Sequence, residues 1–314
     1  MTTQSNLAFI FPGQGSQQIG MLADIAKQWP SVRDTFAEAS EVLGFDLWQL
    51  IQEGTQEELN LTENSQPALL ASSVAVWRIF CEQTAVRPAL LAGHSLGEWS
   101  ALVCGGVLNF ADAINLVRLR GRYMQEAVPV GVGSMAAIIG LADDLIENCC
   151  RQAAQSEVVS AVNYNSPGQV VIAGHVAAVD RAIELCKAAG AKRALPLPVS
   201  APFHTSLMRP AAERLAVHLV DTQFQAPVIP VVHNVTGQTE TDPDAIRSLM
   251  VEQIYSPVGW VACIQTLAEQ GVTRVVECGP GKVLAGLAKR INKELLVEAT
   301  DNGDVLAQAI QSHS

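Results

Sequence analysis

The pentapeptide Gly93-His94-Ser95-Leu96-Gly97 has the residues and spacing of a serine nucleophile. It matches Gly-x-Ser-x-Gly, the turn that carries a serine from a strand into a helix with its hydroxyl exposed. The apolar run 89–92 suits a buried strand, and 98–103 suits a helix with a carboxylate in its first turn. This context predicts Ser95 as a nucleophile and the amide of Leu96 as a donor to an oxyanion. The alternative is a serine that only caps the helix.

A serine nucleophile needs a base, and the sequence offers two candidate histidines. His94 adjoins the serine, so its side chain should diverge from the hydroxyl and support the turn. His204 lies where the chain returns from a predicted small domain to a larger one, and such junctions line clefts. His233 is the other histidine whose position suits a base, so position leaves both open.

Arg120 stands out among the basic residues. On a helix spanning 109–127, apolar side chains lie within roughly 60° of Arg120, whereas Arg118 and Arg122 lie on the opposite face, near roughly 160°. An arginine inside an apolar stripe must meet an anion, because an unpaired buried charge costs several kcal/mol. That anion is either an internal Asp or Glu or the carboxylate of a substrate.

Composition narrows the class of protein. The 314 residues are 49% hydrophobic and 16% charged, which is a globular profile with a large interior. The net charge of −11 argues against nucleic acid or an anionic membrane as a partner. The seven cysteines include no Cys-x-x-Cys pair, a pattern that indicates reduced thiols. The N-terminus does not resemble a signal peptide. We therefore expect a cytoplasmic protein.

No pattern in the sequence indicates a cofactor. The run Gly279-Pro280-Gly281-Lys282 resembles a phosphate-binding loop, but Val283 stands where Ser or Thr is required. No His-Glu-x-x-His pattern and no Cys/His ligand set occurs, so no metal is expected.

The predicted elements form two domains. Strands are expected at 7–11, 89–92, 229–233 and 274–278, alternating with helices, which predicts a mainly parallel sheet covered on both faces. Between them, 135–199 read as β-α-β-β-α-β, the ferredoxin-like order. We predict an α/β fold: a large α/β-hydrolase-like domain of residues 1–128 and 200–314, with a small ferredoxin-like domain of residues 129–199 inserted into it.

Six motifs spread over nearly the whole chain resemble one enzyme family, the malonyl-CoA:acyl carrier protein transacylases of bacterial fatty acid synthesis. They are Phe11-Pro12-Gly13-Gln14-Gly15-Ser16-Gln17, Gly93-His94-Ser95-Leu96-Gly97-Glu98, Arg120-Gly121 with Met124-Gln125, Asn163 to Gly168, Pro202-Phe203-His204, and Glu277 with Gly279-Pro280-Gly281.

The resemblance implies a role for each matching residue. Ser95 is the acylated nucleophile and His204 is its base. The backbone amides of Gln14 and Leu96 form the oxyanion hole. The backbone carbonyl of Gln253 orients the histidine, so the pair works without an acid.

Substrate recognition is also implied by the resemblance. Arg120 binds the free malonyl carboxylate, and Phe203 matches the malonyl-preferring form of the motif before the histidine. The enzyme would move malonyl from malonyl-CoA to the phosphopantetheine thiol of acyl carrier protein through malonyl-Ser95, as a cytoplasmic monomer without a cofactor. Its partners would be malonyl-CoA and the carrier, not nucleic acid or a membrane.

Three alternatives remain at this point. An acyltransferase of a polyketide pathway would share these motifs. A serine hydrolase or thioesterase would need an acid, and Asp143, Asp144 and Asp180 lie between serine and histidine in the required order, although all three fall in the predicted insert. A binding module without catalysis would leave the serine turn unexplained.

An acidic carrier approaching an acidic enzyme must use a local basic patch, since charges act within about a Debye length. Two clusters are candidates for docking the carrier, one at the end of the insert and one on the last predicted helical segment: Lys187, Lys192 and Arg193, and Lys282, Lys289 and Arg290.

Overall fold

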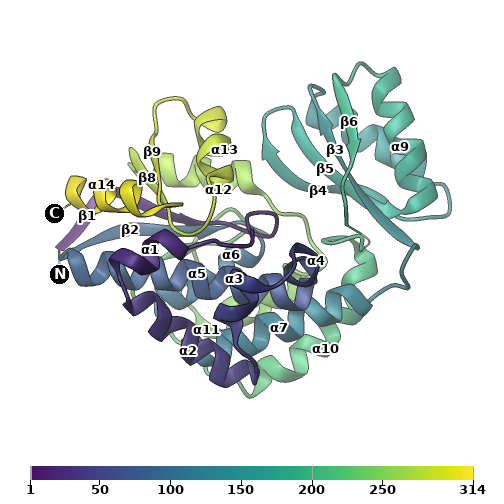
Figure 1. Cartoon of the computed structure of the whole chain (residues 1–314). Coiled ribbons are helices and arrows are strands. Elements are labelled where there is room, and N and C mark those ends of the chain that lie inside the picture. The colour runs from purple at the N-terminus through teal and green to yellow at the C-terminus, as the bar shows by residue number, and fades with distance from the viewer. Residues whose placement is uncertain (1, 200, 314) are drawn as a thin grey trace.

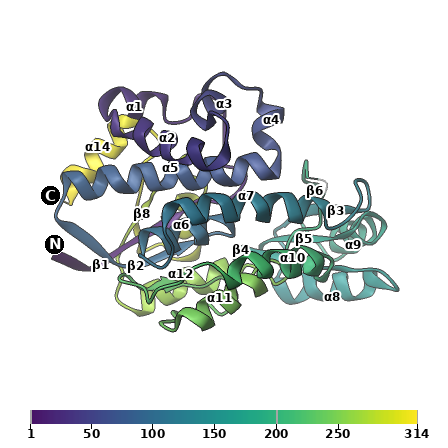
Figure 2. The ribbon, with the colours of Figure 1, turned by 90° about the horizontal axis from the view of Figure 1, so that it is seen from below.

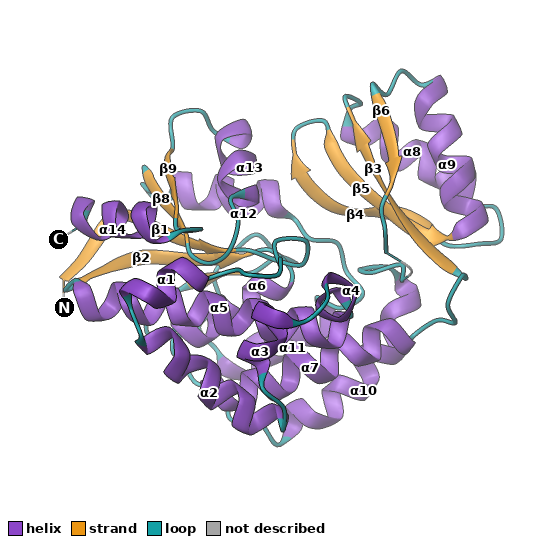
Figure 3. Ribbon diagram, in the orientation of Figure 1, coloured by secondary structure: helices purple, strands orange, loops and turns teal. Residues whose placement is uncertain are grey.

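Two separate β-sheets organise the chain (Figures 1 and 3). The structure, a computed structural model, describes residues 2–199 and 201–313. Within these residues one sheet has five strands and the other has four. The strands are β1 (Thr2–Phe11), β2 (Val86–Gly93), β3 (Gly133–Ile139), β4 (Val159–Ser166), β5 (Gln169–His175), β6 (Arg193–Pro196), β7 (Val231–Val232), β8 (Arg274–Glu277) and β9 (Leu296–Ala299).

The larger sheet is parallel throughout and the smaller one is antiparallel. The larger has the order β7-β2-β1-β8-β9, and each neighbouring pair runs parallel. The smaller has the order β4-β5-β3-β6, with antiparallel pairs. A mixed α/β fold with a mainly parallel sheet is therefore confirmed, and the second sheet falls inside the predicted insert 129–199, whose bounds stay a prediction.

Helices cover both faces of the larger sheet (Figure 2). No helix of the described chain has the length and apolar character that a membrane crossing requires. The helices are α1 (Ala23–Gln28), α2 (Ser31–Leu43), α3 (Leu47–Glu53), α4 (Gln56–Asn60), α5 (Thr62–Gln83), α6 (Leu96–Cys104), α7 (Phe110–Glu126), α8 (Asp143–Ala154), α9 (Val176–Ala188), the 3-10 turn η1 (Ser206–Met208), α10 (Arg209–Val220), α11 (Pro243–Glu252), α12 (Trp260–Glu269), α13 (Val283–Ile291) and α14 (Gly303–Ser312).

Strand β1 divides its side chains between two cores, because successive residues of a strand point to opposite faces. Leu7, Phe9 and Phe11 join the core with α2, α5, α6 and α7. Ala8 and Ile10 join the core with α12 and α13. Both faces are apolar, which explains why β1 reads as an unbroken hydrophobic run rather than an alternating one.

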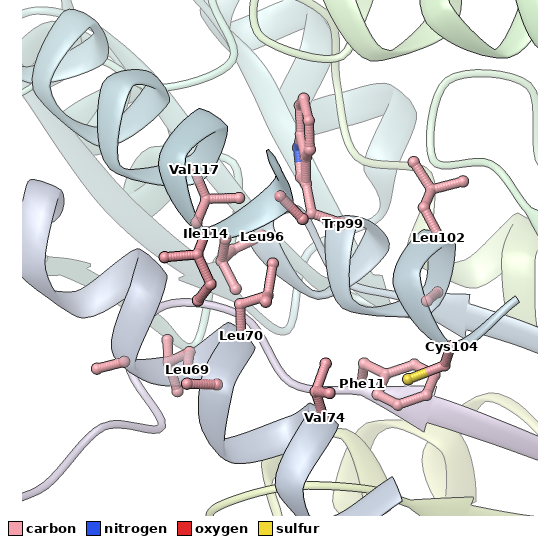
Figure 4. Packing of buried hydrophobic residues seen from close by; sticks show 14 of the residues in the cluster. Phe11, Leu69, Leu70, Val74, Leu96, Trp99, Leu102, Cys104, Ile114 and Val117 are labelled. Carbon is pink, nitrogen blue, oxygen red and sulfur yellow. The ribbon is translucent and has the colours of Figure 1, made fainter. Parts of the chain in front are cut away.

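The helix that follows the serine turn is anchored deep in the first core. Leu96 is 1% exposed and Trp99 is fully buried. Figure 4 shows side chains of α5 and α7, among them Leu70 and Ile114, gathered around Leu96. A close-packed apolar interior resists small displacements, so the position of Ser95 is fixed by the core beneath it.

The smaller sheet has a core of its own on one face, while Met135, Val162, Val171 and Ala173 on its strands join the core of the larger part. Helices α8 and α9 cover one face through residues such as Ile146 and Ile183. Backbone hydrogen bonds join Tyr164 of β4 to Val258, and Val258 back to Val162.

Several elements were not assigned from the sequence. Helices α3 and α4 are short, and the strand β9 and helix α14 lie near the C-terminus. Helix α5 begins at Thr62, so Pro67 lies inside it. Its side chains are buried nearly throughout, so tertiary packing outweighs the loss of one helical hydrogen bond at the proline.

Glu277, at the end of β8, holds the start of α13. The carboxylate is fully buried and accepts hydrogen bonds from the amides of Leu284 (3.1 Å) and Ala285 (2.7 Å). Burial outweighs these donors and raises the pKa of Glu277 from 4.5 to about 7.

Glu277→Gln should change how stability depends on pH. Between the unfolded pKa near 4.5 and the folded pKa near 7, the folded state holds the extra proton, so the free energy of unfolding of the parent falls as pH rises, by on the order of 3 kcal/mol. The variant lacks this contribution. Urea denaturation of both proteins at pH 5 and pH 7.5 measures it, and an equal pH dependence in parent and variant would contradict it.

Candidate active site

The serine turn has the geometry that its sequence predicts. Ser95 lies between β2 and α6 with φ of 50°, a conformation that non-glycine residues adopt rarely. A Cβ on Gly93 would lie 2.0 Å from the carbonyl of Gly97, and one on Gly97 would lie 2.0 Å from the carbonyl of Phe11. Only glycine allows these close approaches, which explains both glycines of the motif.

Ser95 and His204 are in direct contact. Ser95 Oγ lies 2.8 Å from His204 Nε2, and His204 Nδ1 lies 2.8 Å from the backbone carbonyl oxygen of Gln253. A carbonyl can only accept, so Nδ1 carries the proton. In the neutral ring Nε2 is then free to accept the serine proton.

Burial keeps His204 neutral. The residue is 4% exposed, and its burial, followed by the positive charge of Arg120, lowers its pKa to about 3. Its φ of 62° is another rare backbone conformation, and strained conformations of this kind cluster at active sites.

Arg120 is buried at this site, as its place in the apolar stripe of α7 predicts. It is 1% exposed and donates to three neutral oxygens: Gln66 Oε1 (2.9 Å), Gln253 Oε1 (3.0 Å) and Ser95 Oγ (3.1 Å). Burial lowers its pKa to about 10, a value that still leaves it charged. The guanidinium therefore makes its recorded contacts with uncharged groups.

The loop after β1 lies against the serine turn. A Cβ on Gly13 would lie 2.4 Å from the carbonyl oxygen of His94, so the loop can approach this closely only with glycine there. Gln14 follows and lines the same cavity as Ser95. Leu96 is the first residue of α6, where a backbone N–H has no partner within the helix.

A cavity of about 580 Å³ joins these groups, and both parts of the chain line it. Phe203 contributes an apolar wall beside the reactive pair. The lining residues are Gln14, Gly15, Gln17, Gln56, Asn60, Gln66, His94, Ser95, Arg120, Met124, Met135, Asn163, Leu197, Pro198, Val199, Phe203 and His204.

The other candidate histidines from the sequence make different contacts. His94 Nε2 lies 2.8 Å from Asn165 Oδ1, a contact that ties the serine turn to the small sheet. His233, the alternative base, is fully buried with Nδ1 2.8 Å from Glu98 Oε1. The position that an acid would take at His204 is held by the carbonyl of Gln253.

The acids considered for a hydrolase lie on the two helices that cover the small sheet. Asp143 and Asp144 begin α8, and Asp180 lies in α9. No metal-binding group of three or more His, Cys, Asp or Glu side chains occurs within residues 2–199 and 201–313.

Three further residues of the site received no role from the sequence. Asn234 accepts from the amide of Ser95 (2.8 Å) and donates to the carbonyl of Gly93 (2.7 Å). Glu98 is 1% exposed and accepts from Gln253 Nε2 (2.6 Å). Gln66 carried no local signal, because it ends a polar run at the start of α5 and its burial becomes visible only in the fold.

Comparisons with known proteins agree with this geometry. A family model described as an acyl transferase domain matches residues 8–307. The malonyl CoA-acyl carrier protein transacylase of Escherichia coli (strain K12) is 57% identical over 98% of this chain and 99% of that protein, and that of Bacillus subtilis (strain 168) is 46% identical over 98% and 97%.

Solved structures show the same likeness. The crystal structure of the malonyl-CoA:acyl carrier protein transacylase from Xanthomonas oryzae pv. oryzae has a TM-score of 0.98 with 53% identity, covering all of both chains. A malonyl-transacylase solved in complex with its type II PKS acyl-carrier protein has a TM-score of 0.97 with 55% identity, covering 98% of this chain and all of that one.

The low pKa of His204 gives a pH prediction for Ser95. Since the folded pKa is about 3, His204 stays unprotonated above that value, so the serine should keep its reactivity as pH falls from 8 to 5. The rate at which a sulfonyl fluoride labels Ser95, followed by intact mass, measures this. A loss of labelling centred near pH 6.5 would show an ordinary histidine instead.

Proposed function

The chain belongs to the acyl transferase family, among the malonyl-CoA:acyl carrier protein transacylases, and we propose that it moves a malonyl group from malonyl-CoA to the phosphopantetheine thiol of acyl carrier protein. The transfer proceeds by a ping-pong mechanism through malonyl-Ser95 and supplies fatty acid synthesis.

One observation supports this proposal most. Ser95 Oγ contacts both a neutral imidazole and a buried guanidinium, at 2.8 Å and 3.1 Å. A malonyl thioester carries its free carboxylate one methylene away from the carbonyl that the serine attacks. A cation beside the nucleophile therefore suits the malonyl group better than it suits an uncharged acyl group.

In the first half-reaction Ser95 Oγ attacks the thioester carbonyl and His204 Nε2 takes its proton. The amides of Gln14 and Leu96 stabilise the oxyanion of the tetrahedral intermediate, at about 3 kcal/mol for each donor. The C–S bond then breaks, and His204 returns the proton to the sulfur of CoA. The Gln253 carbonyl accepts from Nδ1–H and so stabilises the imidazolium between these steps.

In the second half-reaction the carrier thiol gives its proton to His204 and attacks malonyl-Ser95. The serine leaves and recovers its proton. One thioester replaces another, so the exchange is nearly isoenergetic.

Recognition of malonyl rests on two residues of the cavity. Arg120 takes the free carboxylate through its guanidinium. Phe203 supplies an apolar wall near the reactive carbonyl, as in the malonyl-preferring form of the motif.

For the fold we propose an α/β-hydrolase-like large domain and a ferredoxin-like insert. The strand–Ser95–helix turn after parallel strand β2 supports the first. The order β3-α8-β4-β5-α9-β6 supports the second. All seven cysteines are free, which supports the proposal that the enzyme works in the cytoplasm.

Docking of the carrier at the two basic clusters remains a proposal. Their six side chains are all exposed, and Arg290 of α13 donates to Gln169 at the start of β5 (2.6 Å), so the second cluster borders the small sheet. Lys187 forms an ion pair with Glu184, which reduces the free charge of the first cluster.

Ser95→Ala should abolish malonyl transfer while leaving the fold intact, because the hydroxyl contributes little to the core. Intact mass after mixing with malonyl-CoA should show a malonyl-sized adduct in the parent and none in the variant. Release of free malonate in place of transfer to a carrier thiol would instead indicate a hydrolase.

Arg120→Ala should cost about 3 kcal/mol or more of malonyl recognition, since the carboxylate loses a partner in a sheltered site. Acetyl-CoA lacks this carboxylate and should gain relative to malonyl-CoA. The ratio of kcat/KM values for the two thioesters measures the change. An unaltered ratio would mean that Arg120 serves only its contacts within the protein.

A further inference from the structure

The charge of Arg120 acts on the base as well as on the substrate. Its Nη2 lies 3.1 Å from Ser95 Oγ, and His204 Nε2 lies 2.8 Å from the same oxygen. One hydroxyl oxygen therefore separates the guanidinium from the imidazole. Both side chains are buried, where charges are poorly screened.

No anion reaches this guanidinium directly in the structure of residues 2–199 and 201–313. Its recorded partners are the two amide oxygens of Gln66 and Gln253 and the serine hydroxyl. Glu98 is the nearby carboxylate, but the side-chain amide of Gln253 lies between them, with Nε2 on Glu98 and Oε1 on Arg120.

This arrangement opposes the chemistry of a thioester that has no second charge. When His204 takes the serine proton, an imidazolium forms beside a guanidinium that only neutral groups touch. Two positive charges repel each other strongly in a site sheltered from water. The charge of Arg120 also contributes, after burial, to the low pKa of His204.

A malonyl carboxylate paired with Arg120 would remove that opposition. It neutralises the guanidinium, draws Nη2 from the serine oxygen and leaves Oγ to the histidine. The substrate would then supply the negative charge that no described side chain of the protein places directly on Arg120.

We propose that the carboxylate on Arg120 is an activator of acylation, and that the enzyme therefore has a second activity: acetyl transfer that a small free carboxylate switches on. This inference rests on the proposed function and concerns the same site. In the activated reaction Ser95 Oγ bonds to the acetyl carbon, the C–S bond of acetyl-CoA breaks, and the proton passes through His204 to the CoA sulfur. The added carboxylate is unchanged.

Single-turnover acetylation of Ser95 by acetyl-CoA tests the proposal, with formate as the carboxylate and chloride at equal ionic strength as the control. Formate should raise the rate constant of acetylation about tenfold or more, with saturation, in the parent. It should have no effect in Arg120→Ala, where no guanidinium needs a partner.

An acetylation rate that formate does not raise in the parent overturns the switched activity, and a second measurement tests the opposing charge of Arg120 without formate. Arg120→Ala should acetylate Ser95 faster than the parent does without formate, because the opposing charge is gone. If Arg120 only recognises malonyl, this absolute rate does not rise. An acetylation rate in Arg120→Ala equal to or below that of the parent overturns the proposal.

A matched variant controls for general effects of altering a buried ionisable side chain. Glu277→Gln alters a buried carboxylate that contacts α13 and not the site, so it should keep both the parent acetylation rate and its response to formate.

In parallel, the parent protein is mixed with malonyl-CoA and its intact mass is measured to detect the malonyl adduct on Ser95. Absence of that adduct refutes the proposed function itself. Its presence, together with an acetylation rate that does not rise in Arg120→Ala, refutes only the activation.

Discussion

A positive charge held away from water is the constraint around which this site is arranged. Helix α7 places Arg120 inside the apolar core, where an unpaired charge is costly. The surroundings offset this cost only in part, with two amide oxygens and a hydroxyl. The incomplete compensation is what the proposed pairing of the guanidinium with an anionic substrate requires.

The backbone carbonyl of Gln253, which accepts a hydrogen bond from His204, fits the same constraint. A carboxylate in that position would bring a negative charge close to Arg120 and compete with the proposed substrate carboxylate for it. The carbonyl of Gln253 fixes the imidazole tautomer without adding a charge. Gln253 thus contacts His204 through its backbone and Arg120 through its side chain, while Glu98 fixes the orientation of its amide. The imidazole and the guanidinium are consequently positioned by one residue.

Local patterns predicted those parts of the site that depend on local geometry. The turn at Ser95 follows from two glycines and their flanks, and the burial of Arg120 follows from helical periodicity. The choice between His204 and His233 could not be made locally, because it depends on which one the fold brings to the serine across more than a hundred residues. The contacts of Asn234 and Glu98 are of this long-range kind. The role of Gln253 came from the family resemblance alone, because a backbone carbonyl carries no side-chain signal. Short elements such as α3 and β9 have too few residues for a periodic pattern to identify them.

The way in which the small sheet is attached has a further consequence. The cavity takes part of its lining from the small sheet and the segment after it, and polar contacts such as His94–Asn165 and Arg290–Gln169 hold that side in place. One face of the small sheet has its own core, but Met135, Val162, Val171 and Ala173 of its strands pack in the larger core. The wall that the small sheet gives to the cavity therefore cannot move away without exposing apolar side chains of the larger core, so the shape of the cavity and the packing of the core are kept or lost together.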